Sequence, residues 1–262
     1  MDFSITTLGT ASARPVVNRN QSAHAVRLHG RLFLIDCGEG TQLQLKRHGI
    51  SKARLDNVLI SHLHGDHVFG IFGLLSTMAL DGRTAPLFIY APRDFASLLK
   101  FFLAHFGEGV KYPITHVPLT MKEPCDIISF PNCRVEAFPL RHKIDCYGFR
   151  IHGRMAKMPE ERWASIAYVS DTAVFPEEAS WLQGTDLIYH EATFADEHID
   201  LAHRMFHSTA REAARVAAAA GAGRLVLGHY SSRYPDLTLL QDQAREVFPE
   251  TYLASDGSIF EL

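Results

Sequence analysis

Three histidines and one aspartate fall within the seven residues 61–67, directly after an apolar run that predicts a buried strand. His62 and His64 are two residues apart, so their side chains leave the same side of an extended backbone. Asp66 and His67 follow a glycine turn and can face a second point in space. Imidazole nitrogen and carboxylate oxygen at this density favour zinc, and two groups of ligands predict two ions.

Other polar residues of the same kind stand just past the ends of apolar strands. In α/β proteins, ligands bind in the crevice outside the carboxyl ends of the strands. We therefore expect one shared site to collect the strand-end residues, which are Asp36, His62, His142, Asp171, Glu191 and His229.

A dinuclear centre gives each of these residues a role. Two ions about 4 Å apart share a hydroxide and stabilise both the attacking and the leaving oxygen of an in-line displacement. Asp66 is also placed to orient that nucleophile, and Asp36 is expected to hold a ligand imidazole in one tautomer. The expected ligand sets are His62, His64 and His142 for one ion, Asp66, His67 and His229 for the other, and Asp171 bridging both.

A second polar set lies later in the chain, at residues 190–193 and 207–209. His207 precedes a predicted helix start, where backbone N–H groups and the helix dipole favour a phosphate. A histidine there can protonate a departing oxygen. Glu191 is expected to orient His207, and His190 is expected to be structural.

Composition narrows the class of protein. With 262 residues, 47% of them hydrophobic, the chain can bury one large α/β core, and a net charge of −3 gives no global attraction to nucleic acid or membrane. Fifteen histidines favour metal chemistry. The four cysteines form no CxxC pair, and no signal peptide or apolar run of about 18 residues is present, which predicts a cytoplasmic protein with reduced thiols.

Strands and helices are expected to alternate through one domain, residues 1–262. Residues 152–163 show no period and predict a loop. Strands are expected at 3–8, 25–28, 31–35, 57–60, 86–91, 134–138, 147–151, 166–169, 186–189 and 224–227. Helices are expected at 41–48, at 69–80, from Asp94 as cap to about Phe106, and from the Thr209–Glu212 capping box to Gly221.

These motifs resemble the metallo-β-lactamase superfamily and, within it, the ribonuclease Z family of tRNA 3′-processing endonucleases. The histidine cluster alone is shared by lactamases, thioester hydrolases and nucleases. The finer similarity covers nearly the whole chain and lies in residues 8–13, 19–22, 36–42, 139–142, 170–172, 190–193, 207–209 and 228–234.

The resemblance implies an α/β fold, an αββα sandwich of two mixed sheets flanked by helices. It implies two zinc ions per chain, a homodimer, and a metal-bound hydroxide that attacks phosphorus to leave a 3′-hydroxyl on the tRNA. Its proposed acid and helper correspond to His207 and Glu191. Its metal ligands correspond to His62, His64, Asp66, His67, His142, Asp171 and His229.

The chain departs from the family in one place. The family inserts a long arm that grips tRNA between the residues corresponding to His142 and Asp171, but only 28 residues separate them here. We therefore expect the arm to be shortened or missing near 152–164. The basic residues of this stretch are either the stub of the arm or a solvated loop: Arg150, Arg154, Lys157 and Arg162.

Three functions are compatible with the sequence. The first is a zinc endoribonuclease that removes the 3′ trailer from precursor tRNA. The second keeps the chemistry but acts on small phosphodiesters such as cyclic nucleotides, as the short arm suggests. The third is a binding protein that keeps zinc for stability, against which the Glu191–His207 set argues.

Overall fold

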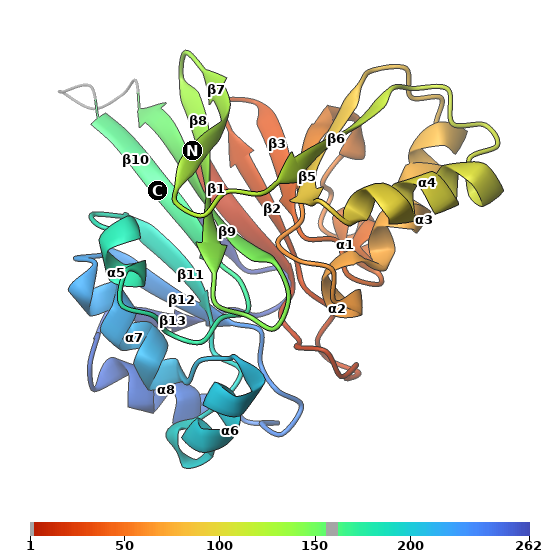
Figure 1. The fold of residues 1–262 in the computed structure, drawn as a ribbon. Helices are drawn as coiled ribbons and strands as arrows, with labels where there is room; N and C mark the ends of the chain where they lie inside the picture. The colour runs from red at the N-terminus through yellow and green to blue at the C-terminus, as the bar shows by residue number, and fades with distance from the viewer. Residues whose placement is uncertain (1–2, 156–161) are drawn as a thin grey trace. The chain divides into compact units, whose positions relative to one another are not determined.

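The computed structural model describes residues 3–155 and 162–262, which gather into two compact units. The first unit comprises described residues 3–120 and 256–260, and the second comprises described residues 121–155, 162–255 and 261–262. Each unit has its own mixed seven-stranded sheet (Figure 1). None of the helices in the described ranges has both the length and the apolar character needed to cross a bilayer.

The sheet of the first unit begins antiparallel and continues parallel. β1, β2 and β3 pair antiparallel, and β3 to β6 pair parallel in chain order. His29 and Gly30 both adopt positive φ, as a two-residue hairpin turn between β2 and β3 requires. In spatial order the strands are β14 (Ile259–Glu261), β1 (Phe3–Gly9), β2 (Ala23–Leu28), β3 (Arg31–Ile35), β4 (Leu55–Leu59), β5 (Leu87–Pro92) and β6 (Ile114–Leu119).

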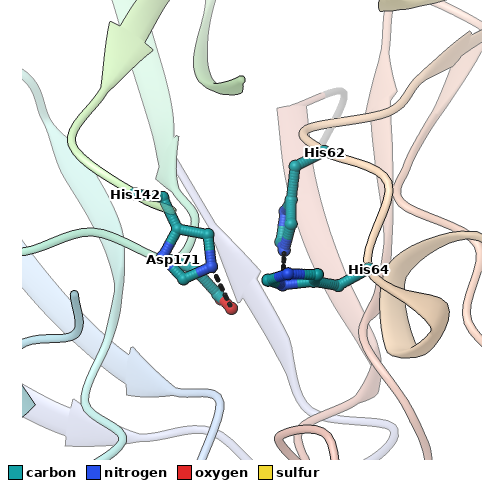
Figure 2. A group of neighbouring side chains, drawn as sticks. All are labelled: His62, His64, His142 and Asp171. Atoms are coloured by element: carbon teal, nitrogen blue, oxygen red, sulfur yellow. Dashed lines mark hydrogen bonds and ion pairs between the residues drawn. The ribbon is translucent and has the colours of Figure 1, made fainter. Parts of the chain in front are cut away.

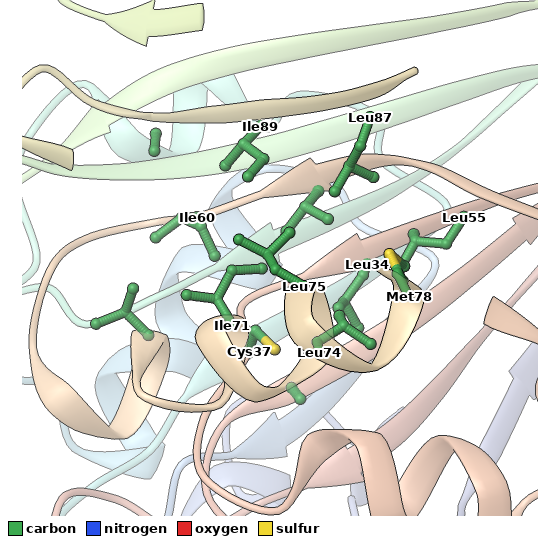
Figure 3. Close-up of a cluster of buried hydrophobic side chains, with 14 of the residues drawn as sticks. Leu34, Cys37, Leu55, Ile60, Ile71, Leu74, Leu75, Met78, Leu87 and Ile89 are labelled. Atoms are coloured by element: carbon green, nitrogen blue, oxygen red, sulfur yellow. The ribbon is translucent and has the colours of Figure 1, made fainter. Parts of the chain in front are cut away.

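Among the described residues, this unit contains four α-helices, and α3 supplies much of its core. Leu74 and Leu75 of α3 are fully buried against residues of β3, β4 and β5 such as Leu34 and Ile89 (Figure 3). The helices are α1 (Thr41–Arg47), α2 (Gly65–Val68), α3 (Gly70–Leu80) and α4 (Phe95–Phe106). Asp94 precedes α4 as predicted, but its side chain accepts no capping hydrogen bond because the residue is itself helical.

The sheet of the second unit runs from an antiparallel edge into a parallel half. β7, β8, β9 and β10 pair antiparallel in chain order, and β10 to β13 pair parallel. Its strands are β7 (Cys125–Phe130), β8 (Cys133–Leu140), β9 (Cys146–Met155), β10 (Arg162–Val169), β11 (Leu187–Glu191), β12 (Arg224–Gly228) and β13 (Thr251–Leu253). Its helices are α5 (Glu178–Trp181), α6 (Ile199–Met205), α7 (Ala210–Ala219) and α8 (Thr238–Arg245).

The predicted start and end of α7 are confirmed. The Thr209 hydroxyl accepts from the Glu212 N–H, and the Glu212 carboxylate accepts from the Thr209 N–H, so both halves of the capping box are present. Gly221 follows the helix with a φ of 61°. Small alanines on the buried face let α7 lie close to β11 and β12.

The predicted loop at 152–163 is wrong at both ends. β9 extends to Met155 and β10 begins at Arg162, and these two residues are paired across an antiparallel hairpin. Cross-strand hydrogen bonds hold this polar stretch extended although its side chains show no alternation. Residues 156–161 of the predicted loop, with Lys157, lie outside the described residues. Strands β6 and β7 were not predicted. Few residues of either strand are buried, and apolar and polar residues do not alternate regularly in their sequences.

Helix α3 offers a direct test of the first core. Leu74→Ala should lower the free energy of unfolding by about 2–5 kcal/mol, because it opens a cavity in a closely packed site. Leu80→Ala in the same helix is the matched control, since Leu80 is 87% exposed and should change stability by less than about 0.5 kcal/mol. Urea unfolding of both variants makes the measurement. Equal losses would contradict this assignment of the core.

Candidate metal centre and active site

In the first unit the histidine cluster occupies the loop after β4 and the start of α2. His62 and His67 are fully buried, and Asp66 is 7% exposed. Parallel β3 ends one position before Asp36, so Asp36 and the cluster lie at the same edge of the sheet. The chain reversal at α2 then turns Asp66 and His67 back toward that edge.

The Asp36 carboxylate organises this set. It is fully buried and accepts from the Ser61 N–H at 2.7 Å, the Ser61 hydroxyl at 2.9 Å and His67 Nδ1 at 2.7 Å. Because Ser61 donates its one proton to Asp36, its oxygen accepts from His62 Nδ1 at 3.0 Å. One carboxylate therefore fixes the tautomers of two imidazoles and leaves Nε2 of each as an electron-pair donor.

The remaining donors lie next to these nitrogens. His62 Nε2 is 3.1 Å from His64 Nδ1 (Figure 2), and His67 Nε2 is 3.4 Å from Asp66 Oδ2. Two ligands of a tetrahedral zinc with bonds of 2.0–2.1 Å lie roughly 3.3 Å apart. Each pair has a spacing that suits two ligands of one ion.

Gly38 and Gly70 allow the close backbone approach that locks this loop. The Cys37 N–H donates to the His67 carbonyl at 2.8 Å, and the Gly70 N–H donates to the Cys37 carbonyl at 2.8 Å. A Cβ on Gly38 would lie 2.3 Å from the Asp66 carbonyl oxygen, so only glycine fits. Burial raises the pKa of the Cys37 thiol to about 12. Cys37 belongs to none of the possible ligand groups found among the described residues.

In the second unit four predicted residues follow strands whose carboxyl ends meet. β8, β10, β11 and β12 run in the same direction, because β8 and β10 are each antiparallel to β9. His142 follows β8, Asp171 follows β10, Glu191 ends β11 and His229 follows β12. This edge brings their side chains together within the unit.

Asp171 lies between two imidazoles. Its Oδ1 is 3.2 Å from His229 Nε2, and its Oδ2 is 3.8 Å from His142 Nε2 (Figure 2). His142 Nδ1–H donates a hydrogen bond to the Phe206 carbonyl at 2.9 Å. In the neutral imidazole this leaves Nε2, which faces Asp171, with a free electron pair. Within this unit Asp171, His207 and His229 form a group whose possible ligand atoms lie within 4.8 Å of one another.

Glu191 is held by backbone and imidazole donors. Oε1 accepts from the Ser208 N–H at 2.9 Å, the Thr172 N–H at 3.2 Å and His207 Nδ1 at 2.9 Å, while Oε2 accepts from the Thr193 N–H at 2.9 Å. Burial would raise the pKa of Glu191, but the charge and hydrogen bond of His207 outweigh it and lower the pKa to about 2. The carboxylate is therefore ionised at neutral pH.

His207 is the most accessible member of this group, with 15% of its side chain exposed. Its ring stacks against His229 with centroids 5.7 Å apart. Because Nδ1 is engaged by Glu191, a proton on Nε2 is the one available for transfer. A carboxylate-supported imidazole of this kind can act as a general acid.

The donor set fits a metal. Two electron-pair donors such as His229 Nε2 and Asp171 Oδ1, at 3.2 Å, repel unless a cation lies between them, either a further proton or a metal ion. Imidazoles anchored through the other ring nitrogen are typical of metal ligands. The His/Asp groups of both units therefore indicate metal binding.

Comparison with known proteins places this site in a family. The family model for a β-lactamase superfamily domain matches residues 31–230. The ribonuclease Z of Parabacteroides distasonis is 37% identical over 297 aligned positions that cover 98% of each chain. The chain belongs to the ribonuclease Z family.

Other members of the ribonuclease Z family agree with this assignment. The ribonuclease Z of Cytophaga hutchinsonii is 35% identical, with 99% of this chain and 96% of the relative covered. The crystal structure of human tRNase Z, short form, superposes with a TM-score of 0.84 at 29% identity, covering 98% of both chains. The metallo-β-lactamase fold, with two mixed sheets flanked by helices, is confirmed.

Sequence reasoning missed the hydroxyl groups that position the predicted residues. The hydroxyls of Ser61 and Thr193 bond directly to the predicted residues His62 and His229. Thr172 and Ser208 reach Glu191 through their backbone N–H groups, and their hydroxyls bond to backbone groups of the same loops. Their adjacency to His62, Asp171 and the 190–193 motif was the available signal. Hydroxyl residues at strand ends are common, so only the folded geometry distinguishes these from ordinary turn formers.

Two of the basic residues predicted as a possible arm stub are engaged within their own unit. Arg150 donates to the backbone carbonyls of Trp181 and Gln183 at 3.3 and 3.0 Å, and Arg162 pairs with Asp186. The hairpin of β9 and β10 uses 10 and 8 residues of the connection between His142 and Asp171. These contacts favour a structural role for both arginines.

His190 is structural by its contacts. It is fully buried, and its Nε2 lies 3.0 Å from Oε1 of the equally buried Glu178 of α5. Burial lowers the pKa of His190, but the hydrogen bond and charge of Glu178 outweigh this effect and raise it above its ordinary value. The pair joins α5 to β11 behind Glu191.

This pair predicts a pH-dependent stability. A raised histidine pKa contributes stability that is fully present below about pH 6.5 and is lost as pH rises through the folded-state pKa. Glu178→Gln should lower the free energy of unfolding by about 3 kcal/mol at pH 6 and by less at pH 9. Urea unfolding in the presence of chelator measures the loss at each pH. Glu177→Gln is the control, because Glu177 is the neighbouring residue and is exposed. A loss independent of pH would count against a charged pair.

Proposed function

We propose that this protein is a zinc-dependent endoribonuclease that removes the 3′ trailer from precursor tRNA. The observation that carries this proposal is the near-full-length match to ribonuclease Z proteins at 37% identity. The buried Glu191 beside the accessible His207 supports it, because hydrolysis of a phosphodiester needs a proton for its leaving oxygen. The reaction class is a metal-dependent phosphodiester hydrolysis.

The metal in this proposal is zinc, with two ions per chain. Sets of imidazole nitrogens with carboxylate oxygens suit zinc. In each unit, hydrogen bonds to Nδ1 hold the histidines in the tautomer whose Nε2 can bind a metal. When bound, the zinc pair would supply an activated water and neutralise charge on the phosphate. The proposed ligands are His62, His64, Asp66, His67, His142, Asp171 and His229.

The side chains of the protein divide the remaining work. Asp66 accepts a hydrogen bond from the attacking water and holds it in line with phosphorus. His207 donates its Nε2 proton to the departing 3′-oxygen of the tRNA. Glu191, ionised and held by backbone N–H groups, keeps His207 oriented and stabilises its protonated form.

Further parts of the proposal follow from the family resemblance or from the sequence. The homodimeric assembly comes from that resemblance. A cytoplasmic location, a single domain over residues 1–262 and a shortened tRNA-gripping arm near 152–164 come instead from the sequence, and the arm is where the chain departs from the family. The alignment to the Parabacteroides relative has 297 positions whereas this chain has 262 residues, which is consistent with a missing insertion. Small phosphodiesters such as cyclic nucleotides remain the alternative substrate suggested by the short connection.

Metal and Asp66 dependence test the chemistry. Removing metal with a chelator should abolish cleavage of a defined precursor tRNA, and added zinc should restore it. Asp66→Ala should lower kcat/KM by more than about 100-fold. Losing a group that only orients a metal ligand lowers activity by at most about 100-fold, and Asp66 is proposed both to bind metal and to orient the attacking water. Asp94→Ala changes an exposed aspartate without a capping bond and is the control. Metal that raises the melting temperature but yields no hydrolysis would instead indicate a zinc-stabilised binding protein.

The substrate class has its own test. Turnover on precursor tRNA, with the cut mapped by sequencing, is compared with turnover on a chromogenic phosphodiester. Cleavage directly after the discriminator base, with tRNA strongly preferred, is the expected result. A small ester hydrolysed as fast as the tRNA would favour the alternative.

His207 is tested by separating chemistry from binding. His207→Ala should lower kcat by about 10²–10⁴-fold and leave KM little changed, because the proton donor acts at the departing oxygen. His203→Ala in α6 is the matched control, since that histidine is 52% exposed and pairs with Glu212 instead. A kcat unchanged in His207→Ala would remove this residue from the mechanism.

A further inference from the structure

The hydroxyl of Thr193 lies at the centre of the polar group in the second unit. Thr193 is two residues beyond Glu191 and is 4% exposed. Its Oγ1 is 2.9 Å from His229 Nδ1, 3.1 Å from the His229 carbonyl oxygen and 3.3 Å from His207 Nδ1. One buried hydroxyl thus contacts a predicted metal ligand and the predicted acid.

The proton inventory fixes the direction of these bonds. A carbonyl oxygen only accepts, so the single Thr193 proton goes to the His229 carbonyl. Oγ1 then accepts from His229 Nδ1–H, and in the neutral imidazole this leaves Nε2 unprotonated and directed at Asp171 Oδ1, 3.2 Å away. The His207 Nδ1–H, bonded to Glu191 at 2.9 Å, reaches Oγ1 as a second, longer contact.

Neighbouring hydroxyls do not have this arrangement. Thr172 Oγ1 donates to the Ala173 carbonyl and accepts from the Arg141 N–H, and Ser208 Oγ donates to the Thr172 carbonyl. These partners are backbone groups, so the two hydroxyls hold loops. Thr193 differs because two imidazoles converge on its oxygen.

We infer that Thr193 is a positioning residue that sets the tautomer of His229 for metal binding and couples this ligand to His207. The inference rests on the proposed metal site. A histidine ligand binds best when its other nitrogen donates to a fixed acceptor, and loss of such an acceptor typically weakens metal binding 10–100-fold. Because the same oxygen faces His207, its loss should also disturb the acid.

Zinc affinity tests this role separately from catalysis. Thr193→Val keeps the shape and removes the hydroxyl, and Thr193→Ser restores it. Competition with a chromogenic zinc chelator should show at least about a 10-fold weaker zinc affinity for Thr193→Val and near wild-type affinity for Thr193→Ser. Thr185→Val is the matched control. Thr185 is also buried and its hydroxyl donates to the Leu182 carbonyl, but it precedes the start of β11, whereas Thr193 follows the end of that strand.

The outcomes distinguish this inference from the proposed function. Wild-type protein that binds zinc, together with Thr193→Val of equal affinity, overturns the role of Thr193 alone. Wild-type protein that binds no zinc overturns the metal site and this role with it. Equal weakening in Thr193→Val and Thr185→Val also overturns it, as a general effect of lost stability. At saturating zinc, kcat of Thr193→Val should stay below that of Thr193→Ser, and equal values would exclude the coupling to His207. If Thr193→Val does not fold, Thr193→Ala replaces it in the same comparison.

Discussion

The hydrogen bond to Nδ1 is the constraint on which this site depends. A neutral imidazole carries one proton, so engaging one nitrogen as a donor leaves the other with a free electron pair. Asp36 does this for His67 directly and for His62 through Ser61, while the Phe206 carbonyl does it for His142 and Thr193 for His229. Within each unit these bonds leave Nε2 of the anchored imidazoles as the atom with the free electron pair.

These anchors require unusual backbone and burial. Asp36, Phe206 and His229 all have φ between +57° and +59°, a backbone conformation that residues other than glycine rarely adopt. Such residues cluster at functional sites, where the surrounding structure holds them in place. Glu191 is fully buried, and the penalty of burying its charge is offset by three backbone N–H donors and His207.

The short connection between β9 and β10 bears on how an RNA substrate is recognised. Met155 pairs with Arg162, so only residues 156–161 lie between the paired ends of these strands. Arg150 and Arg162 are bonded inside their own unit, and the chain has a net charge of −3. Phosphate contacts usually dominate affinity for nucleic acid, so binding of tRNA in the proposed function would have to use basic residues outside this pair.

The sequence by itself determined the strand–ligand pattern, the capping box of α7 and the family. These features are local: a strand, a turn or a motif is written in adjacent residues, and parallel strands bring their carboxyl ends to one edge. Family membership then confirmed the fold and the class of reaction.

Only the tertiary structure decided which atoms meet. The bonds from Asp36 to Ser61 and His67 join residues 25 and 31 positions apart, and Thr193 meets His229 across 36 positions. The polar hairpin after Ile151 likewise became strand through cross-strand pairing that no local pattern reveals. Hydrogen-bond direction depends on distances of a few tenths of an ångström between such distant residues, and residue spacing along a chain does not encode them.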